Sequence, residues 1–379
     1  MGAIEAMKVC HLASGDLWAG AEVQLAMLLR GLVQYRNVEL RAILFNSGIL
    51  ADRIADAGIP VEVIEESRHN SLSLMLKTKK ILKRDKIEIL HTHRYKENFL
   101  GGLASRGTSV KHIVRTVHGM GEPFRGFQNV KAQFYAYLDR MASERWVNKI
   151  VAVSNDINRS LAWLYGEEKM VTIHNGIEAD RVPQRTDVAS AKRKLGVEAD
   201  TPVIGTVGRH MPVKGYDVLL RAFKLVNERK PEARLVLVGD GPERASLESL
   251  AAGLGIDSRV VFYGFTEDVA AAMSAFDVFV LSSIHEGISI SLLEAFAMGI
   301  PVVVTDVGGN PEVVRHMETG LIVPPRDEGR LADALTELLD DKQLCGKMIK
   351  NQREVVTGEF SAETMAQRTE ELYRELMAE

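Results

Sequence analysis

Residues 282–301 constrain the fold of this chain more than any other stretch of its sequence. They lie between two short apolar runs, 278–281 and 302–304, which are typical of buried strands. Apolar side chains from Leu292 to Ala297 recur at helical spacing, and a Gly-Ile-Pro triplet then ends the helix. The stretch is therefore predicted to fold as a strand, a loop, a helix and a second strand.

The N-terminus of this helix is a predicted anion site. The first backbone N–H groups of a helix have no partner within it, and they place a partial positive charge near the end of the preceding strand. Ser282, Ser283 and Gly287 lie in the loop there, and their side chains are small. We therefore expect a phosphate group to bind at this end of the helix.

Two carboxylates belong to the same stretch. Glu286 precedes the helix and Glu294 lies inside it, which puts them roughly 9 to 12 Å apart along the helix axis. A glycosidase pair would lie about 5 to 9.5 Å apart. The spacing favours an extended ligand with hydroxyl groups at both ends and a diphosphate between them, as in a sugar nucleotide. The alternative is that both glutamates only decorate an exposed helix.

A second strand-to-helix loop carries two cations. Residues 203–207 form a predicted strand, and Arg209 and Lys214 follow it before a helix that begins at about Tyr216. An arginine can hold a phosphate by two hydrogen bonds, and a lysine adds a point charge. The loop is therefore predicted to bracket a diphosphate, and ordinary surface charge is the alternative.

The N-terminal part of the chain offers a third junction of this kind. A predicted strand at 7–13 opens into a loop with Gly20 and Glu22, and a leucine-rich helix follows. An ordinary tight turn is the alternative, because such turns need glycine for geometry alone.

Histidines end two later strands of the same part. His118 follows the predicted strand at 113–117, and His91 and His93 end the strand before it. Ligands of open α/β sheets bind at the carboxyl ends of the strands, so we favour a functional His118 over a purely structural one and rank His91 and His93 lower. We expect the glycine-rich loop at 119–127 to receive an acceptor.

The whole chain is predicted to hold two domains. Its 379 residues exceed what one hydrophobic core usually serves. The polar stretch 179–201 has the composition of an interdomain connection. Strands alternate with helical patterns in the first half, which predicts a parallel sheet with helices on both faces. The further predicted strands there are 38–45, 61–64, 87–90, 150–153 and 171–173.

Composition excludes several classes of protein. A net charge of −4 argues against a nucleic-acid binder. Cys10 and Cys345 lack metal-ligand spacing and suggest a reducing cytoplasm without disulfides. The N-terminus does not resemble a signal peptide, and no apolar run approaches the ~18 residues of a membrane span. We therefore expect a cytoplasmic protein, soluble or peripheral on the cytoplasmic face of the membrane.

The Glu-x7-Glu motif from Glu286 to Glu294, with its flanks, resembles the retaining glycosyltransferases of family 4, which have the GT-B fold. The Gly-Arg-x4-Lys-Gly spacing at 208–215 is similar to the donor-phosphate clamp of this family. Gly20 and Glu22 resemble its Gly-Gly-x-Glu loop, with Ala19 in place of the first glycine. The resemblance also covers His118, which matches a histidine near the transferred sugar.

This resemblance implies two Rossmann-like, doubly wound parallel-sheet domains that face each other across a cleft. Residues 1–182 would form the acceptor-binding domain, and residues 183–361 would bind the nucleotide-sugar donor. The last helix, 362–379, would pack back on the first domain.

The resemblance also implies a hexosyltransferase with retention of configuration. It would move a sugar from a UDP- or GDP-sugar to a glycan or lipid-linked acceptor, in cell-envelope or exopolysaccharide biosynthesis. The sequence holds no pair of aspartates separated by one residue, so the Asp-x-Asp metal ligands of the other common glycosyltransferase fold are missing. We therefore expect transfer without a metal or a cofactor.

Residue roles follow from the same resemblance. Arg209 and Lys214 would stabilise the leaving nucleoside diphosphate. Glu294 would bind the ribose hydroxyls, and His118 would orient the transferred sugar. The remaining contacts to the donor would come from Gly20, from Glu286 and from the backbone amides near Ile288 and Ser289.

Three alternatives to this function stay open at this point. The first is a catalytically silent sugar-nucleotide sensor or partner subunit on the same fold. The second is a dehydrogenase, although Arg244 occupies the third glycine position of the Gly-x-Gly-x-x-Gly pattern that starts at Gly239. The third is a glycosidase, which would cleave sugar bonds without a nucleotide.

A basic helix adds a question about membranes. The predicted helix 71–85 could contact anionic lipid headgroups, and a solvated basic face is the alternative. Its cations are Lys77, Lys79, Lys80, Lys83 and Arg84.

Overall fold

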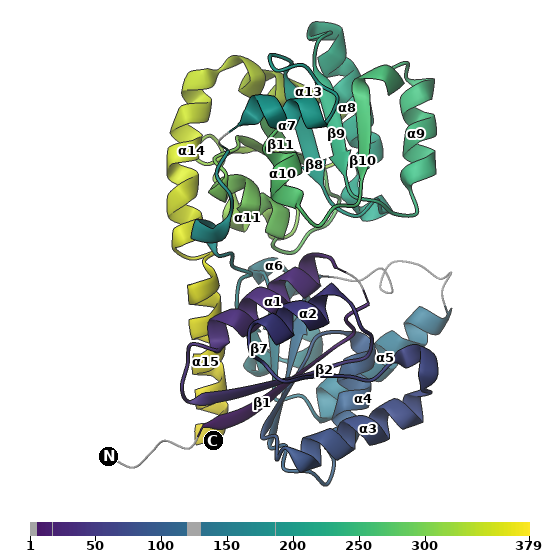
Figure 1. Cartoon of the computed structure of the whole chain (residues 1–379), viewed down its shortest axis with the longest axis vertical. Coiled ribbons are helices and arrows are strands. Elements are labelled where there is room, and N and C mark those ends of the chain that lie inside the picture. The colour runs from purple at the N-terminus through teal and green to yellow at the C-terminus, as the bar shows by residue number, and fades with distance from the viewer. Residues whose placement is uncertain (1–5, 17, 120–129, 186) are drawn as a thin grey trace. The chain divides into compact units, whose positions relative to one another are not determined.

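The computed structural model describes residues 6–16, 18–119, 130–185 and 187–379, and it divides into two compact units (Figure 1). The first unit runs to Gly176 and is completed by Ala362–Glu379, and the second is Ile177–Ser361. The first unit ends before the expected residue 182, because the N–H of Ile177 already donates to the carbonyl of Phe360 in the second unit, at 3.0 Å.

The first unit is built on a seven-stranded parallel sheet in the order β3-β2-β1-β4-β5-β6-β7. The strand order reverses between β1 and β4, and such a reversal opens a crevice at the carboxyl ends of the two strands. The strands are β1 (Met7–Ala13), β2 (Val38–Leu44), β3 (Val61–Val63), β4 (Ile89–Thr92), β5 (His112–Val117), β6 (Lys149–Ala152) and β7 (Met170–Thr172).

Side chains alternate between the two faces of this sheet, as the period of a strand requires. Along β1, Val9 and Ala13 join the core beneath α1, α2 and α15, whereas Cys10 and Leu12 join the core beneath α3, α4 and α6. The helices of this unit are α1 (Gly20–Leu32), α2 (Ile49–Asp56), α3 (Ser71–Arg84), α4 (Tyr95–Ser105), α5 (Val130–Arg145), α6 (Asn155–Tyr165) and α15 (Ala362–Ala378).

The C-terminal helix α15 is part of the first unit, and Figure 1 shows it in yellow beside α1. A β-carbon on Gly31 of α1 would come within 2.7 Å of the β-carbon of Ala366, so the two helices approach closely where glycine leaves room. The core of the first unit includes side chains of this helix, among them Met365, Leu372 and Tyr373. Residues from both ends of the sequence therefore share one core.

The second unit repeats the architecture with a six-stranded parallel sheet in the order β10-β9-β8-β11-β12-β13, whose order reverses between β8 and β11. Its strands are β8 (Val203–Val207), β9 (Arg234–Val238), β10 (Val260–Gly264), β11 (Val278–Leu281), β12 (Val302–Thr305) and β13 (Leu321–Val323). Its helices are α7 (Val188–Lys194), α8 (Tyr216–Arg229), α9 (Arg244–Gly253), α10 (Val269–Met273), α11 (Ile290–Ala297), α12 (Asn310–Val313), α13 (Glu328–Asp340) and α14 (Lys342–Thr357).

Two doubly wound parallel-sheet units confirm the predicted fold class. Residues 278–304 fold as predicted, with β11, a loop, α11 and β12 in that order. Among the described helices, none combines the length and the apolar character that crossing a membrane requires.

Candidate functional site

The loop between β8 and α8 places Lys214 at the carboxyl end of the second sheet. Gly215 lies just before α8 with a φ of 61°, a conformation that strains other residues. A β-carbon on Gly215 would also lie 2.3 Å from the carbonyl oxygen of Ser282, which follows β11. Glycine therefore lets the two loops touch at the switch point of the sheet.

Lys214 forms an ion pair with Glu286 across these two loops. Its Nζ lies 2.7 Å and 3.0 Å from the two carboxylate oxygens, and the side chains are only 18% and 13% exposed. The hydroxyl of Ser283 donates to the same carboxylate at 2.8 Å, and that of Ser282 donates to the carbonyl of Lys214 at 2.9 Å. The small polar residues of this loop thus fix the ion pair from both sides.

The turn after β12 packs against the loop that holds Glu286. Gly308 has a φ of 53°, and a β-carbon on it would lie 1.8 Å from the carbonyl oxygen of Glu286. The N–H of Gly309 donates to that oxygen at 3.2 Å, and the hydroxyl of Thr305 donates to the carbonyl of Ser283 at 2.7 Å. Support of the Glu286 loop by these three residues was not predicted, although adjacent glycines after a strand are a signal of close approach.

Arg209 and Glu294 are the two predicted donor contacts that have no side-chain partner within the part of the chain that the structure describes. Arg209 is exposed in the loop after β8. Glu294 lies on α11 and is partly exposed, and burial raises the pKa of its carboxyl group to about 7. An unpaired guanidinium and an unpaired carboxyl group can bind a phosphate and a pair of hydroxyls, respectively.

The N-terminus of α11, one helical turn before Glu294, is the predicted anion site. Ser289 precedes the helix, and its side chain does not cap the helix but bonds the hydroxyl of Ser291 at 3.0 Å. The Ser291 hydroxyl also donates to the carbonyl of Val207 at the end of β8, at 3.4 Å. Ile288, just ahead, is buried. The helix therefore starts beside the strand that leads to Arg209 and Lys214, as an anion site requires.

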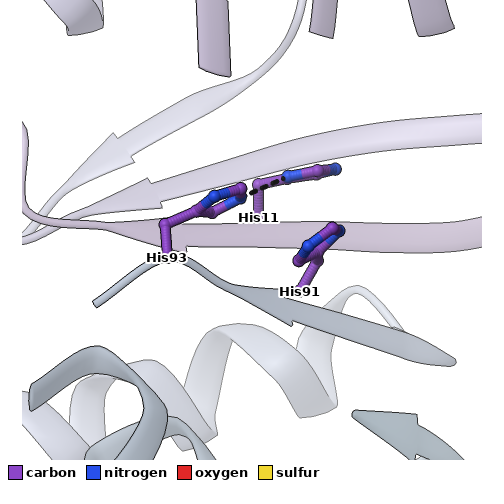
Figure 2. A group of neighbouring side chains, drawn as sticks. All are labelled: His11, His91 and His93. Carbon is purple, nitrogen blue, oxygen red and sulfur yellow. Dashed lines mark hydrogen bonds between the residues drawn. The ribbon is translucent and has the colours of Figure 1, made fainter. Parts of the chain in front are cut away.

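In the first unit, His118 belongs to a cluster of four histidines. His11 of β1 and His91 of β4 are register partners at the switch point, and His93 and His118 follow β4 and β5. Figure 2 shows the rings of His11 and His93 joined by a hydrogen bond, with an N–N distance of 2.9 Å. The nearest ring nitrogens of His93 and His118 are 3.2 Å apart. His91 and His93 were predicted as weaker candidates than His118, and no role was predicted for His11.

Burial keeps these histidines neutral. It lowers the pKa of His11 and of His118 to about 3, and it lowers the pKa values of His91 and His93 well below the usual range. Three of the rings, those of His11, His91 and His93, could in principle offer ligand atoms to a metal, which all lie within 4.8 Å of one another. As arranged, a hydrogen bond already occupies the space between His11 and His93, and both nitrogens of His91 have partners.

Gly20 begins α1, and its predicted role is compatible with its surroundings. A β-carbon there would meet no described atom within 4 Å, so packing does not require glycine at this position. Glu22 is buried on the same helix and pairs with Arg94, and burial raises the pKa of its carboxyl group. Residues 120–127 of the expected acceptor loop lie outside the described residues.

The fold defines a two-domain protein of the doubly wound type, in which ligands bind at the carboxyl ends of the strands. Residues 18–181 match the family model described as Glycosyltransferase Family 4, and residues 187–355 match the one described as Glycosyl transferases group 1. An N-acetyl-α-D-glucosaminyl L-malate synthase of Bacillus anthracis is 30% identical over 81% of this chain and 79% of that protein. The chain therefore belongs to glycosyltransferase family 4, as predicted.

Two further comparisons cover nearly the whole chain. A UDP-Gal:α-D-GlcNAc-diphosphoundecaprenol α-1,3-galactosyltransferase of Escherichia coli is 28% identical over 98% of this chain and 97% of that protein. The structure of HepE from Anabaena in complex with UDP-glucose superposes with a TM-score of 0.86, covers 97% of this chain and 100% of its own, and is 24% identical. The GT-B fold and the glycosyltransferase activity are thereby confirmed, and the comparisons give no support to the sensor alternative.

Proposed function

We propose that this glycosyltransferase moves a hexose from a UDP-sugar to a lipid-linked glycan acceptor of the cell envelope. The Escherichia coli relative supports the donor and the acceptor, because it uses UDP-Gal and a diphosphoundecaprenol-linked sugar. The observation that carries the proposal in this chain is the ion pair of Lys214 and Glu286, which lies in the second sheet's crevice near the start of α11.

The donor diphosphate would be held by positive charge from three sources. Lys214 and Arg209 come from the loop after β8, and the start of α11 adds the partial charge of a helix N-terminus. These groups stabilise the charge that develops on the leaving diphosphate. They would supply what a metal supplies in other glycosyltransferases, so we propose transfer without a metal.

The two glutamates would bind the two ends of the donor. Glu294 would accept hydrogen bonds from the ribose hydroxyls, since no described side chain occupies its carboxyl group. Glu286 would contact the transferred sugar while Lys214 turns toward the diphosphate. Backbone amides near Ile288 and Ser289 would lie beside it, Gly20 would let the donor phosphate approach α1, and His118 would contact the sugar from the first unit.

Retention of configuration is also a proposal, and it follows the family resemblance. The leaving phosphate would take the proton of the acceptor hydroxyl while the new glycosidic bond forms on the face that the diphosphate leaves. Proton NMR of the product, with its anomeric coupling constant, tests this stereochemistry directly. A β-linked product from an α-linked donor would contradict it.

The release of nucleoside diphosphate tests the transfer itself. Purified protein is mixed with UDP-, GDP- or ADP-sugars and a diphosphoundecaprenol-linked sugar, and we expect turnover with a UDP-sugar and loss of it in Glu286→Gln. Glu354→Gln, an exposed glutamate on α14, is the matched control. Full turnover in Glu286→Gln, or release that does not need the acceptor, would contradict the proposal.

The exposed face of α3 favours peripheral membrane contact on the cytoplasmic side. Leu72 and Leu76, one helical turn apart, are 62% and 53% exposed and lie next to Lys77 and Lys80. Exposed leucines beside lysines suit an anionic lipid surface, where each nearby cation contributes about 1 kcal/mol. Arg84 is not available for this contact, because it pairs with Glu62 and Asp85.

Vesicle co-sedimentation distinguishes this contact from a solvated basic face. We expect binding to vesicles that contain phosphatidylglycerol and not to neutral ones, with loss of binding in Leu72→Ser/Leu76→Ser. Lys77→Gln/Lys80→Gln should also weaken binding to the anionic vesicles. Its control is Lys347→Gln/Lys350→Gln on α14, which removes the same number of charges. Equal binding to both kinds of vesicle would exclude the electrostatic part of the proposal.

A further inference from the structure

Six side chains of the first unit form one continuous line of hydrogen bonds, which we name the histidine series. It begins at Thr116 in β5 and ends at His118, and Tyr373 of the C-terminal helix stands in the middle. The links join Thr116 Oγ1 to His91 Nε2 (2.7 Å), His91 Nδ1 to the Tyr373 hydroxyl (2.6 Å), that hydroxyl to His11 Nε2 (3.1 Å), His11 Nδ1 to His93 Nε2 (2.9 Å), and His93 Nδ1 to His118 Nε2 (3.2 Å).

Each link restricts the tautomer of the next ring. A neutral imidazole has one nitrogen that donates and one that accepts, so two facing ring nitrogens must differ in protonation. Every ring in the series turns its Nε2 toward Thr116 and its Nδ1 toward the other end. The four rings therefore have two fully bonded states, one with all four protons on Nδ1 and one with all four on Nε2.

The two ends of the series, Thr116 and His118, decide between these two states, because each state leaves one end with a proton that has no acceptor. Thr116 is 3% exposed, and His91 Nε2 is the one hydrogen-bond partner of its hydroxyl in the described part of the chain. If His91 Nε2 carried the proton, the buried hydroxyl hydrogen of Thr116 would have no acceptor, which costs the desolvation of a polar group. If the hydroxyl donates instead, its proton and those of His91, Tyr373, His11 and His93 all find an acceptor, and the proton left over lies on Nδ1 of the half-exposed His118.

We propose that the histidine series holds His118 in the tautomer with the proton on Nδ1, and that Tyr373 is the positioning residue which transmits this choice from Thr116. His118 Nδ1 is buried and has no partner among the described residues, so it is the end of the series that a ligand can satisfy. The inference rests on the proposed contact of His118 with the sugar. In that contact His118 donates a hydrogen bond to an oxygen and does not act as a base.

Nitrogen-15 NMR of histidine-labelled wild-type protein tests the series without any need for turnover. Two-bond proton–nitrogen correlations distinguish the two tautomers of each ring. We expect the form with the proton on Nδ1 to predominate in all four rings, because Thr116 is enclosed by protein whereas the ring of His118 is half-exposed. A proton on Nε2 of His118, or an even mixture in the wild type, would overturn the proposal. A divalent metal bound by His11, His91 and His93 would overturn the proposal too, since it would replace the proton that His11 Nδ1 donates to His93 Nε2.

Variants test the transmission through Tyr373. Tyr373→Phe removes the donor to His11, so we expect His11, His93 and His118 to become mixtures of both tautomers. Thr116→Val should have the same effect on His118, and Thr116→Ser should restore the wild-type spectrum because it keeps the hydroxyl. Tyr165→Phe, which removes another buried tyrosine hydroxyl of this unit, is the control and should leave His118 unchanged.

The two proposals fail in different ways. If the tautomers are as expected but Tyr373→Phe transfers sugar at the wild-type rate, the series stands and the proposed contact of His118 with the sugar is wrong. If Tyr373→Phe leaves the His118 tautomer unchanged, Tyr373 is not a positioning residue, whatever the enzyme transfers.

Discussion

The two units share one topology but fill the crevice at the switch point with opposite chemistry. In the second unit the crevice holds charge, namely the ion pair of Lys214 with Glu286 and the unpaired side chain of Arg209. In the first unit it holds neutral, buried rings, with His11 and His91 side by side on β1 and β4. A doubly wound sheet thus supplies a place for a ligand, and the side chains at its strand ends decide what kind of ligand group fits.

The difference follows from how each crevice handles the cost of burial. In the second crevice Lys214 and Glu286 are paired and the unpaired Arg209 is exposed, which limits the desolvation of these charges. In the first crevice His11, His91 and His93 are buried and His118 is half-exposed, and these rings avoid charge and satisfy one another by hydrogen bonds instead. A diphosphate requires charges of the kind found in the second unit, whereas sugar hydroxyls can bind to neutral rings of the kind found in the first unit.

Acidification is expected to have the largest effect, and it should act on the first unit. The histidine pKa values lie near 6.5 in the unfolded chain and far lower in the folded one, so the folded state loses stability as the pH falls below about 6.5. Each buried histidine contributes up to about 1.4 kcal/mol per pH unit. All three tryptophans, Trp18, Trp146 and Trp163, belong to this unit, so their fluorescence in urea at pH 8, 6 and 5 reports its unfolding.

The control for this experiment is an exposed histidine. His316→Gln in the second unit should leave the pH dependence unchanged. A urea midpoint of wild-type tryptophan fluorescence that is constant from pH 8 to pH 5 would show that the first crevice is not neutral, and the contrast between the units would be lost.

Loss of charge in the second crevice should have the next largest effect. Lys214→Met keeps the length of the side chain but removes its charge, and we expect kcat to fall by about 100- to 1000-fold. Lys347→Met, on the exposed face of α14, is the matched control. The rate of UDP release is the measurement, and a Lys214→Met rate within threefold of wild type would exclude a role in transition-state stabilisation.

The backbone that holds the charged crevice can be tested with two glycines. Gly215→Ala forces a φ of 61° on alanine and drives its β-carbon against Ser282, whereas Gly255→Ala has a similar φ of 70° but open space. We expect Gly255→Ala to cost about 1 kcal/mol in the free energy of unfolding and Gly215→Ala to cost about 2 kcal/mol or more. Urea unfolding compares them, and equal losses would show that the contact with Ser282 does not matter.

The smallest expected effect is a pH dependence of donor binding. Glu294 must be ionised to accept two ribose hydroxyls, and its pKa is about 7 in the free protein. The affinity for UDP should therefore weaken by up to about tenfold for each pH unit below 7. Calorimetry at pH 8, 7 and 6 measures this, and Glu294→Gln should give a weaker but nearly constant Kd. If Kd depends on pH as strongly in Glu294→Gln as in the wild type, a group other than Glu294 causes the pH dependence.

Much of the charged site could be predicted because its signals are local. Arg209 and Lys214 lie within one loop, and Glu286 and Glu294 lie on either side of one helix start, so strand, loop and helix patterns place each pair. Their mutual pairing could not be predicted. Lys214 and Glu286 are distant in sequence and meet because β8 and β11 are neighbours at the switch point.

The histidine series was accessible to sequence reasoning only in part. A histidine at the end of a strand is a visible signal, and this singled out His118 and, less strongly, His91 and His93. His11 lies within β1 and Tyr373 within the last helix, and neither pattern indicates a hydrogen bond between two ends of the chain. The raised pKa of Glu294 was not predicted either, because burial of one helix face depends on what packs over it.

The sequence by itself determined the two doubly wound sheets, the family and the loops for which we propose phosphate binding, since the period of hydrophobic residues and short spacings act over a few residues. Only the tertiary structure decided the ion pair between Lys214 and Glu286 and the path from Thr116 through Tyr373 to His118. The physical reason is that parallel strands far apart in sequence become neighbours, and burial then sets which groups can remain charged.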